Sequence, residues 1–339
     1  MEPRIVRGAP VDIERYPWSA LVFNSGALCA GTILNIFSIL SAAHCFSHNN
    51  KTSDISVHVG SRFLYDHNAL VYSVNRIDSH EEYNKETPFS CDIALIFVNN
   101  PIDFSKRAQK ADLIDNDRWM NKNEHGFTVT GWGVIKHNGP LSEHGLLMAT
   151  LNYIPSAECS VMHNLKLTAD MFCLYGHAHM DSCSGDSGGG VLWNGYVVGI
   201  VSHGDGCSNK DKPSVYTNVW FFRKWITEKI IAYLQYFNSK HTNIDKVKAD
   251  ICQSIHCYKN YSTLSPKNNN RLINFAPYLH QFDKNEKKRY TFELIVRKTQ
   301  LSEPHCRCEL PALRSVALGR PPVAPRAAAP RTKHNLTAH

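Results

Sequence analysis

The sequence predicts an all-β fold that is closed by one helix. Three observations predict this fold class. The first 220 or so residues contain many short runs rich in β-branched and aromatic residues. Clusters of Asn, Gly, Asp and Pro separate these runs, as turns separate strands. One later segment alone has helical periodicity. Many short strands with turn signals between them are typical of a β-sandwich or a β-barrel.

The expected elements follow in chain order. The strand-like runs are residues 18–23, 55–59, 93–98, 127–130, 190–193 and 196–201. The helical segment is residues 221–237, where apolar side chains recur every three or four residues. These apolar residues are Phe222, Trp225, Ile226, Ile230, Tyr233 and Leu234. We expect this helix to close the domain.

Charge divides the chain of 339 residues into two parts. Residues 238–339 hold 18 Lys and Arg against 7 Asp and Glu, whereas residues 1–237 hold 19 against 23. The main body is therefore mildly acidic, and nucleic-acid binding is not expected.

No apolar run approaches the ~20 residues that span a bilayer, so no membrane partner is expected. Residues 1–4 lack the apolar core of a secretory leader. Either a leader is missing from this sequence or the protein is cytosolic, and the 11 cysteines favour the first reading.

We expect residues 238–339 to form a basic, mostly disordered tail that contains four cysteines: Cys252, Cys257, Cys306 and Cys308. The stretch 313–331 is rich in Ala, Pro and Arg and is expected to be disordered. The tail is a solvated extension or, alternatively, binds an acidic surface such as a glycosaminoglycan. Its Cys and His spacings match no standard zinc pattern, and no metal or cofactor is expected.

A nucleophilic serine is indicated by the turn Gly185-Asp186-Ser187-Gly188-Gly189. A serine hydroxyl needs a base that takes its proton and donors that hold the developing oxyanion. The Gly185 and Ser187 amides are the candidate donors. His44 and Asp92 precede Ser187, and each alone could be a structural histidine or a cap residue. Together, in the order His, Asp, Ser, they suggest a catalytic triad.

These three residues, together with the sequences around them, give the chain a resemblance to the chymotrypsin/trypsin family of serine proteases over residues 5–237. The resemblance depends on separated motifs: Ile5-Val6-Arg7-Gly8, Ala42-Ala43-His44-Cys45, Asp92-Ile93-Ala94-Leu95, Gly131-Trp132-Gly133, Gly185-Asp186-Ser187-Gly188-Gly189 and Pro213-Ser214-Val215-Tyr216-Thr217. It implies two six-stranded antiparallel β-barrels with the active site between them and a C-terminal helix. It also implies an acyl-enzyme mechanism in which Ser187 attacks, His44 is base and then acid, and Asp92 orients His44. Ser202 matches the serine that supports the buried aspartate.

The resemblance also implies activation by cleavage between Arg4 and Ile5. The freed Ile5 ammonium would pair with Asp186 inside the domain. Residues 1–4 would be the remnant of an activation peptide, and a chain that keeps them is expected to be a zymogen.

By resemblance, six cysteines pair as Cys29–Cys45, Cys159–Cys173 and Cys183–Cys207. Phe127 and Trp193 stand where the family has a further bridge, so both partners are missing together. Five cysteines then remain, an odd number that leaves at least one free or intermolecular. Cys91 either bridges to the tail or stays a buried thiol, and the thiol is favoured.

Asp181 occupies the position that forms the base of the primary pocket in the trypsin branch, with Ser182 beside it. This implies cleavage after Arg or Lys. Ser214 stands where a pocket wall has glycine, so it is expected to narrow the pocket and to hydrogen-bond to Asp181. This narrowing is expected to reduce cleavage after Lys less than cleavage after Arg. In the opposite wall of the pocket, Gly204 is the residue that the family has.

Two further departures from the family pattern lie close to these residues. His203 replaces an aromatic residue, and Gly190 replaces a proline. We expect a secreted, extracellular and monomeric endopeptidase that acts on proteins or peptides and meets protease inhibitors. The alternatives are a catalytically weak or silent homologue that binds rather than cuts, and a protease whose primary specificity is altered by Ser214.

Overall fold

The structure is a computed structural model of the chain. It describes residues 8–121, 124–134, 145–164, 166–176, 181–207, 209, 211–240, 292–293 and 307–308. The chain divides into two units, residues 1–263 and 264–339. In the second unit the described strands are β15 (Phe292–Glu293) and β16 (Arg307–Cys308), which pair antiparallel. The expected cleavage site at Arg4 and the stretch 313–331, which was expected to be disordered, lie outside the described residues.

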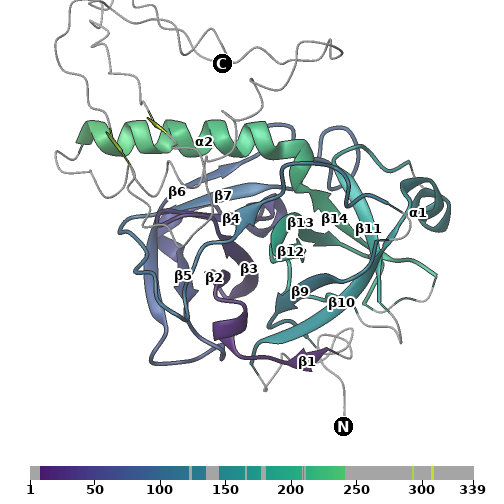
Figure 1. Cartoon of the computed structure of the whole chain (residues 1–339), viewed down its shortest axis with the longest axis horizontal. Coiled ribbons are helices and arrows are strands. Elements are labelled where there is room, and N and C mark those ends of the chain that lie inside the picture. The colour runs from purple at the N-terminus through teal and green to yellow at the C-terminus, as the bar shows by residue number, and fades with distance from the viewer. Residues whose placement is uncertain are drawn as a thin grey trace, which may run out of the picture. The chain divides into compact units, whose positions relative to one another are not determined.

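The first unit begins with a closed antiparallel barrel, in the order β2-β3-β4-β7-β6-β5 (Figure 1). Its strands are β2 (Ser19–Asn24), β3 (Ala27–Ile33), β4 (Ser38–Ser41), β5 (Ile55–Val59), β6 (Leu70–Ser79) and β7 (Ala94–Val98). The runs expected at 18–23, 55–59 and 93–98 are therefore strands. Every residue of β7 is buried, which explains why its sequence is continuously apolar.

A second barrel follows, in the order β9-β10-β11-β14-β13-β12, and it closes because β12 and β10 both pair with β9. Its strands are β9 (Phe127–Gly131), β10 (Leu147–Ile154), β11 (Met171–Tyr175), β12 (Gly190–Trp193), β13 (Tyr196–His203) and β14 (Ser214–Asn218). The short strands β1 (Ala9–Pro10) and β8 (Asp112–Leu113) pair with β10 and β13. The expected fold class, two six-stranded antiparallel barrels with a C-terminal helix, is confirmed.

The helix α2 (Val219–Lys240) closes the domain and extends beyond the expected 221–237 at both ends. Tyr233 stacks on Phe97 with ring centroids 4.1 Å apart, and its hydroxyl donates to the Val98 carbonyl. The helix therefore packs on the first barrel. A second helix, α1 (Ser156–His163), was not expected, and η1 (Ile13–Arg15), η2 (Ala43–Phe46) and η3 (Thr52–Asp54) are single 3₁₀ turns. Among the described residues no helix is long and apolar enough to cross a membrane.

Three disulfides join the six cysteines in the expected pairs: Cys29–Cys45, Cys159–Cys173 and Cys183–Cys207. Phe127 and Trp193, where the family has another bridge, stack with ring centroids 6.5 Å apart. An aromatic contact thus joins β9 to β12 at the place of a covalent one. Cys91 is a free, half-buried thiol, in agreement with the favoured expectation.

Candidate active site

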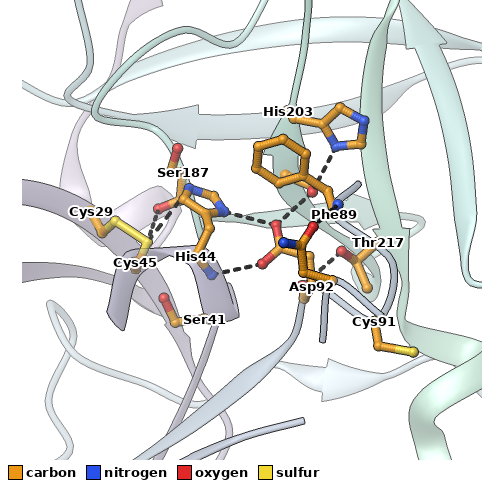
Figure 2. A network of polar contacts seen from close by, with 12 residues as sticks. Cys29, Ser41, His44, Cys45, Phe89, Cys91, Asp92, Ser187, His203 and Thr217 are labelled. Carbon is orange, nitrogen blue, oxygen red and sulfur yellow. Dashed lines mark hydrogen bonds and ion pairs between the residues drawn. A yellow bond between two sulfur atoms is a disulfide. The ribbon is translucent and has the colours of Figure 1, made fainter. Parts of the chain in front are cut away.

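The candidate catalytic residues come from both barrels. His44 lies in η2, directly after β4, and Asp92 lies two residues before β7. Ser187 precedes β12, and Ser202 lies in β13, both in the second barrel. The Ala30 amide of β3 donates to the Ser187 carbonyl at 2.7 Å and links the two halves of the site. Figure 2 shows His44 with Asp92 on one side and Ser187 on the other.

Asp92 is fully buried and accepts three hydrogen bonds. Its Oδ1 accepts from the His44 backbone amide at 2.9 Å, and its Oδ2 accepts from His44 Nδ1 at 2.8 Å. The Ser202 hydroxyl donates to Oδ2 at 2.6 Å. Since the carboxylate can only accept, His44 Nδ1 carries the hydrogen. A neutral His44 therefore keeps a lone pair on Nε2, which is the atom a base needs.

Ser187 lies in a turn that requires glycine. A Cβ atom on Gly188 would lie 2.3 Å from Ser41 Oγ and 2.4 Å from the Ala30 carbonyl oxygen, and the φ of Gly188 is +84°. Ser187 Oγ forms no hydrogen bond with His44 here. Such bonds are often long before substrate binds. The amides of Gly185 and Ser187 donate to no other described residue, so both are available to an external acceptor.

Asp186 is fully buried beside Ser187. Its carboxylate accepts from the Gly133 amide at 2.7 Å and from the Cys183 amide at 2.9 Å. Burial raises the pKa of Asp186 to about 7, against these two hydrogen bonds, and the charge of Asp181 adds to the rise. Arg4 and Ile5, its expected activation partners, lie outside the described residues.

The residues expected in the primary pocket lie together. Ser214 Oγ donates to Asp181 Oδ1 at 2.6 Å, and both residues are buried. Ser182 Oγ and the Tyr216 hydroxyl are 3.0 Å apart. A Cβ atom added to Gly204 would lie 3.2 Å from Ser214 Oγ, so this hydroxyl lies beside the opposite wall as well as beside the carboxylate.

Sequence reasoning noted His203 but missed its surroundings. The His203 ring stacks on Phe89 with centroids 4.4 Å apart and an interplanar angle of 12° (Figure 2). Phe89 also meets His44 edge-on at 5.9 Å. Phe89 has a φ of 61°, in the left-handed region that aromatic residues rarely adopt. No pattern in the sequence signals this conformation, so the stack could not be predicted.

Two other residues near the site have surroundings that the sequence does not reveal. Gly190 follows the Gly188-Gly189 pair because a Cβ atom at this position would lie 2.2 Å from Thr32 Oγ1. Burial, with the charges of Asp170, Glu82 and Glu86, raises the pKa of the Cys91 thiol to about 11. Cys91 is therefore a poor nucleophile beside Asp92.

Two groups of side chains in the described part of the chain have the spacing of metal ligands: Cys29, His44 and Cys45, and Cys159, His163 and Cys173. Their cysteines are joined in disulfides, so the sulfur atoms are not thiolates that could bind a metal.

Two barrels that bring a serine, a histidine and a buried aspartate together define a serine protease. The trypsin family model matches residues 5–226, and the chain belongs to this family. Trypsin of Phaedon cochleariae is 33% identical over 230 residues, which is 66% of this chain and 88% of that protein. Trypsin delta of Drosophila melanogaster is 29% identical over 230 residues, 67% of this chain and 88% of that protein.

The transmembrane protease serine 11E of Mus musculus is 33% identical over 234 residues, which is 66% of this chain and 54% of that protein. The chain thus spans about half the length of this relative. The protein is a serine endopeptidase of the trypsin type.

Proposed function

We propose that this protease is a secreted endopeptidase that cleaves after Lys or Arg and is activated by cleavage between Arg4 and Ile5. The observation that carries the catalytic part of the proposal is the buried Asp92 carboxylate, which accepts from the His44 amide, the His44 ring and Ser202. Because Nδ1 faces Asp92, His44 Nε2 points away from Asp92 and is the nitrogen that can accept a proton. A serine protease needs a base held in this tautomer.

In the proposed reaction Ser187 Oγ attacks the scissile carbonyl carbon, and His44 Nε2 takes the hydroxyl proton. The Gly185 and Ser187 amides hold the carbonyl oxygen as it becomes an oxyanion. His44 then gives its proton to the leaving amine, and an acyl-enzyme forms on Ser187. Water, deprotonated by His44, hydrolyses the ester and regenerates the serine. Asp92 stays ionised throughout and stabilises the imidazolium.

The primary pocket is proposed to bind a cationic side chain at Asp181. A buried carboxylate at the end of a pocket favours a cation that replaces its lost hydration. Ser214 already donates to Oδ1, so the two-oxygen face that an Arg fork needs is partly occupied. A Lys ammonium is a point charge and needs no such fork. We therefore expect Lys to be preferred over Arg.

Activation is proposed through Asp186. Its raised pKa means that two backbone amides do not offset the burial of its charge. An ammonium group from Ile5 would supply that charge, as the family resemblance suggests. Secretion is proposed from the three disulfides and from the named trypsin relatives. A monomeric state and inhibition by protease inhibitors complete the proposal.

The nucleophile is tested by cleaving the full chain after Arg4 and adding a peptidyl phosphonate. We expect mass spectrometry to find the label on Ser187 in the cleaved chain, and no label in the uncleaved chain or in cleaved Ser187→Ala. A cleaved chain that neither takes the label nor hydrolyses peptides would overturn the proposal.

The pocket is tested with paired peptide amides that differ only in Lys or Arg at the cleaved bond. Asp181→Asn should lower kcat/KM for both on the order of 10²-fold, because it removes the partner of a buried charge. Ser214→Gly should raise kcat/KM for Arg by about 10-fold and leave Lys nearly unchanged, since one hydrogen bond is worth about 1 kcal/mol. A strong Arg preference in the unaltered enzyme would contradict the role given to Ser214.

A further inference from the structure

His203 extends the hydrogen-bonded chain that begins at His44. Its Nδ1 lies 3.0 Å from Ser202 Oγ, and Ser202 Oγ lies 2.6 Å from Asp92 Oδ2. Four side chains are thus linked in series: His203, Ser202, Asp92 and His44. Figure 2 shows the rings of His203 and Phe89 next to each other, close to Asp92 and His44.

A bulge in β13 brings His203 next to Ser202. In the pairing with β14, Val201 is opposite Tyr216 and His203 is opposite Val215, so Ser202 has no partner of its own. In a regular strand the side chains of neighbouring residues point to opposite faces. A bulge changes the direction in which a side chain points. Here it allows the His203 ring to contact the hydroxyl of Ser202, the residue directly before it.

The direction of each hydrogen bond follows from counting hydrogens. Ser202 has one hydroxyl hydrogen, and this hydrogen is donated to Asp92. Toward His203 the same oxygen can therefore only accept, so His203 Nδ1 must carry a hydrogen.

Burial keeps the second ring nitrogen of His203 unprotonated. It lowers the pKa of His203 to about 4, with Asp92 opposing and His163 and His44 adding to the decrease. At neutral pH the ring is neutral and holds its single hydrogen on Nδ1.

We infer that His203 is a positioning residue, which holds the Ser202 hydroxyl on Asp92 by donating to it from Nδ1. A hydroxyl that accepts one hydrogen bond donates a stronger one, and its rotation is restricted. The stack on Phe89 fixes the plane of the His203 ring and so the direction of its N–H. The inference depends on the proposed function, because the arrangement has a measurable effect only if His44 is the base.

Two substitutions separate this role from simple packing. His203→Phe keeps a ring that can stack on Phe89 and removes the donor. His203→Asn removes the ring and keeps an amide donor close to the place of Nδ1. Both are compared with the unaltered enzyme, Ser202→Ala and Ser202→Ala/His203→Phe. All five are cleaved after Arg4, checked for folding by thermal melting and counted by phosphonate titration before kcat and KM are measured on a Lys peptide amide.

We expect His203→Phe to lower kcat by about 3–10-fold, the effect of one hydrogen bond, with KM nearly unchanged. His203→Asn should stay within about 2-fold of the unaltered enzyme. In the Ser202→Ala background, His203→Phe should have no further effect, since residues that act through one another are not additive.

Three results would overturn the inference: an unchanged kcat in His203→Phe, a larger loss in His203→Asn than in His203→Phe, or the same loss from His203→Phe with and without Ser202. An unaltered enzyme with no label and no turnover would instead refute the proposed function, and the inference with it.

Discussion

The uncleaved chain should lose stability as the pH rises, because of Asp186. Its pKa is raised from 3.8 in the unfolded chain to about 7 in the folded one by burial. Between these two values the folded chain holds a proton on Asp186 that the unfolded chain has released. The free energy of unfolding therefore decreases as the pH rises from about 4 to about 7. It remains at the lower value above pH 7, where both states are ionised.

The size of the effect follows from the shift. One pKa unit corresponds to about 1.4 kcal/mol, so a shift of about three units is worth up to about 4 kcal/mol. The perturbation is Asp186→Asn, which cannot ionise. It is introduced into a chain that also carries Arg4→Gln and Ser187→Ala, so that neither activation nor self-cleavage occurs. Other titrating groups are the same in both chains and cancel in the difference.

The assay is urea unfolding of both chains between pH 4.5 and pH 8. The difference in free energy of unfolding should change by about 3 kcal/mol over this range, in favour of the Asn chain at pH 8. Parallel pH profiles would refute the reasoning. In a second pair of chains that keeps Arg4, with Ser187→Ala, and is cleaved after Arg4, the sign should reverse, because Asp186→Asn then leaves the Ile5 ammonium unpaired, at a cost of about 3–5 kcal/mol.

Three further predictions concern single side chains. Ser187→Ala should lower kcat of the cleaved enzyme by about 10⁴–10⁶-fold, and burst kinetics with a chromogenic ester would check that no acyl-enzyme forms. Phe127→Ala should lower the free energy of unfolding by about 3–5 kcal/mol in urea at constant pH, because it empties a buried site and removes the stack on Trp193. Alkylation of Cys91, followed by peptide mapping, should be slow at pH 8 and accelerate about 10-fold per pH unit up to about pH 10, because the thiolate is the reacting form and the pKa of Cys91 is about 11. Fast labelling at pH 7 would contradict the environment described for this thiol.

The strands that could be predicted are those whose sequences are runs of β-branched and aromatic residues. The run 93–98 is continuously apolar and becomes β7, where every residue is buried. The strand β6 was not among the expected runs. It alternates buried with exposed positions and includes Asn75, Arg76 and Asp78, so its composition resembles a loop. Its strand conformation comes from pairing with β5 and β7.

The helix α1 was missed for a related reason. It has eight residues, and Cys159 is its only buried one, so no apolar stripe marks it. The disulfide to Cys173 in β11 fastens it to the second barrel. An isolated helix of this length is unstable in water, and tertiary contacts decide whether it forms.

In the site, motifs predicted which residues come together, but local backbone geometry was not visible in the sequence. Ser214 was expected beside Asp181 and donates to it. The link from His203 to Ser202 depends on the bulge in β13, and the stack on Phe89 depends on a left-handed residue. Both are properties of strand pairing and loop closure, which single-residue preferences do not encode.

The site contains two fully buried carboxylates, and the difference between them supports the activation proposed above. Both lose their hydration on folding, which must be offset by donors or by a cation. Asp92 receives hydrogen bonds from the His44 amide, the His44 ring and Ser202, all supplied by the folded domain. Asp186 receives two backbone amides, and its pKa still rises to about 7. The hydrogen bonds of Asp92 are thus complete before any cleavage, whereas the charge of Asp186 needs a cation. Cleavage that frees an ammonium group would therefore act on the Ser187 turn through Asp186 and leave the His44–Asp92 pair as it is.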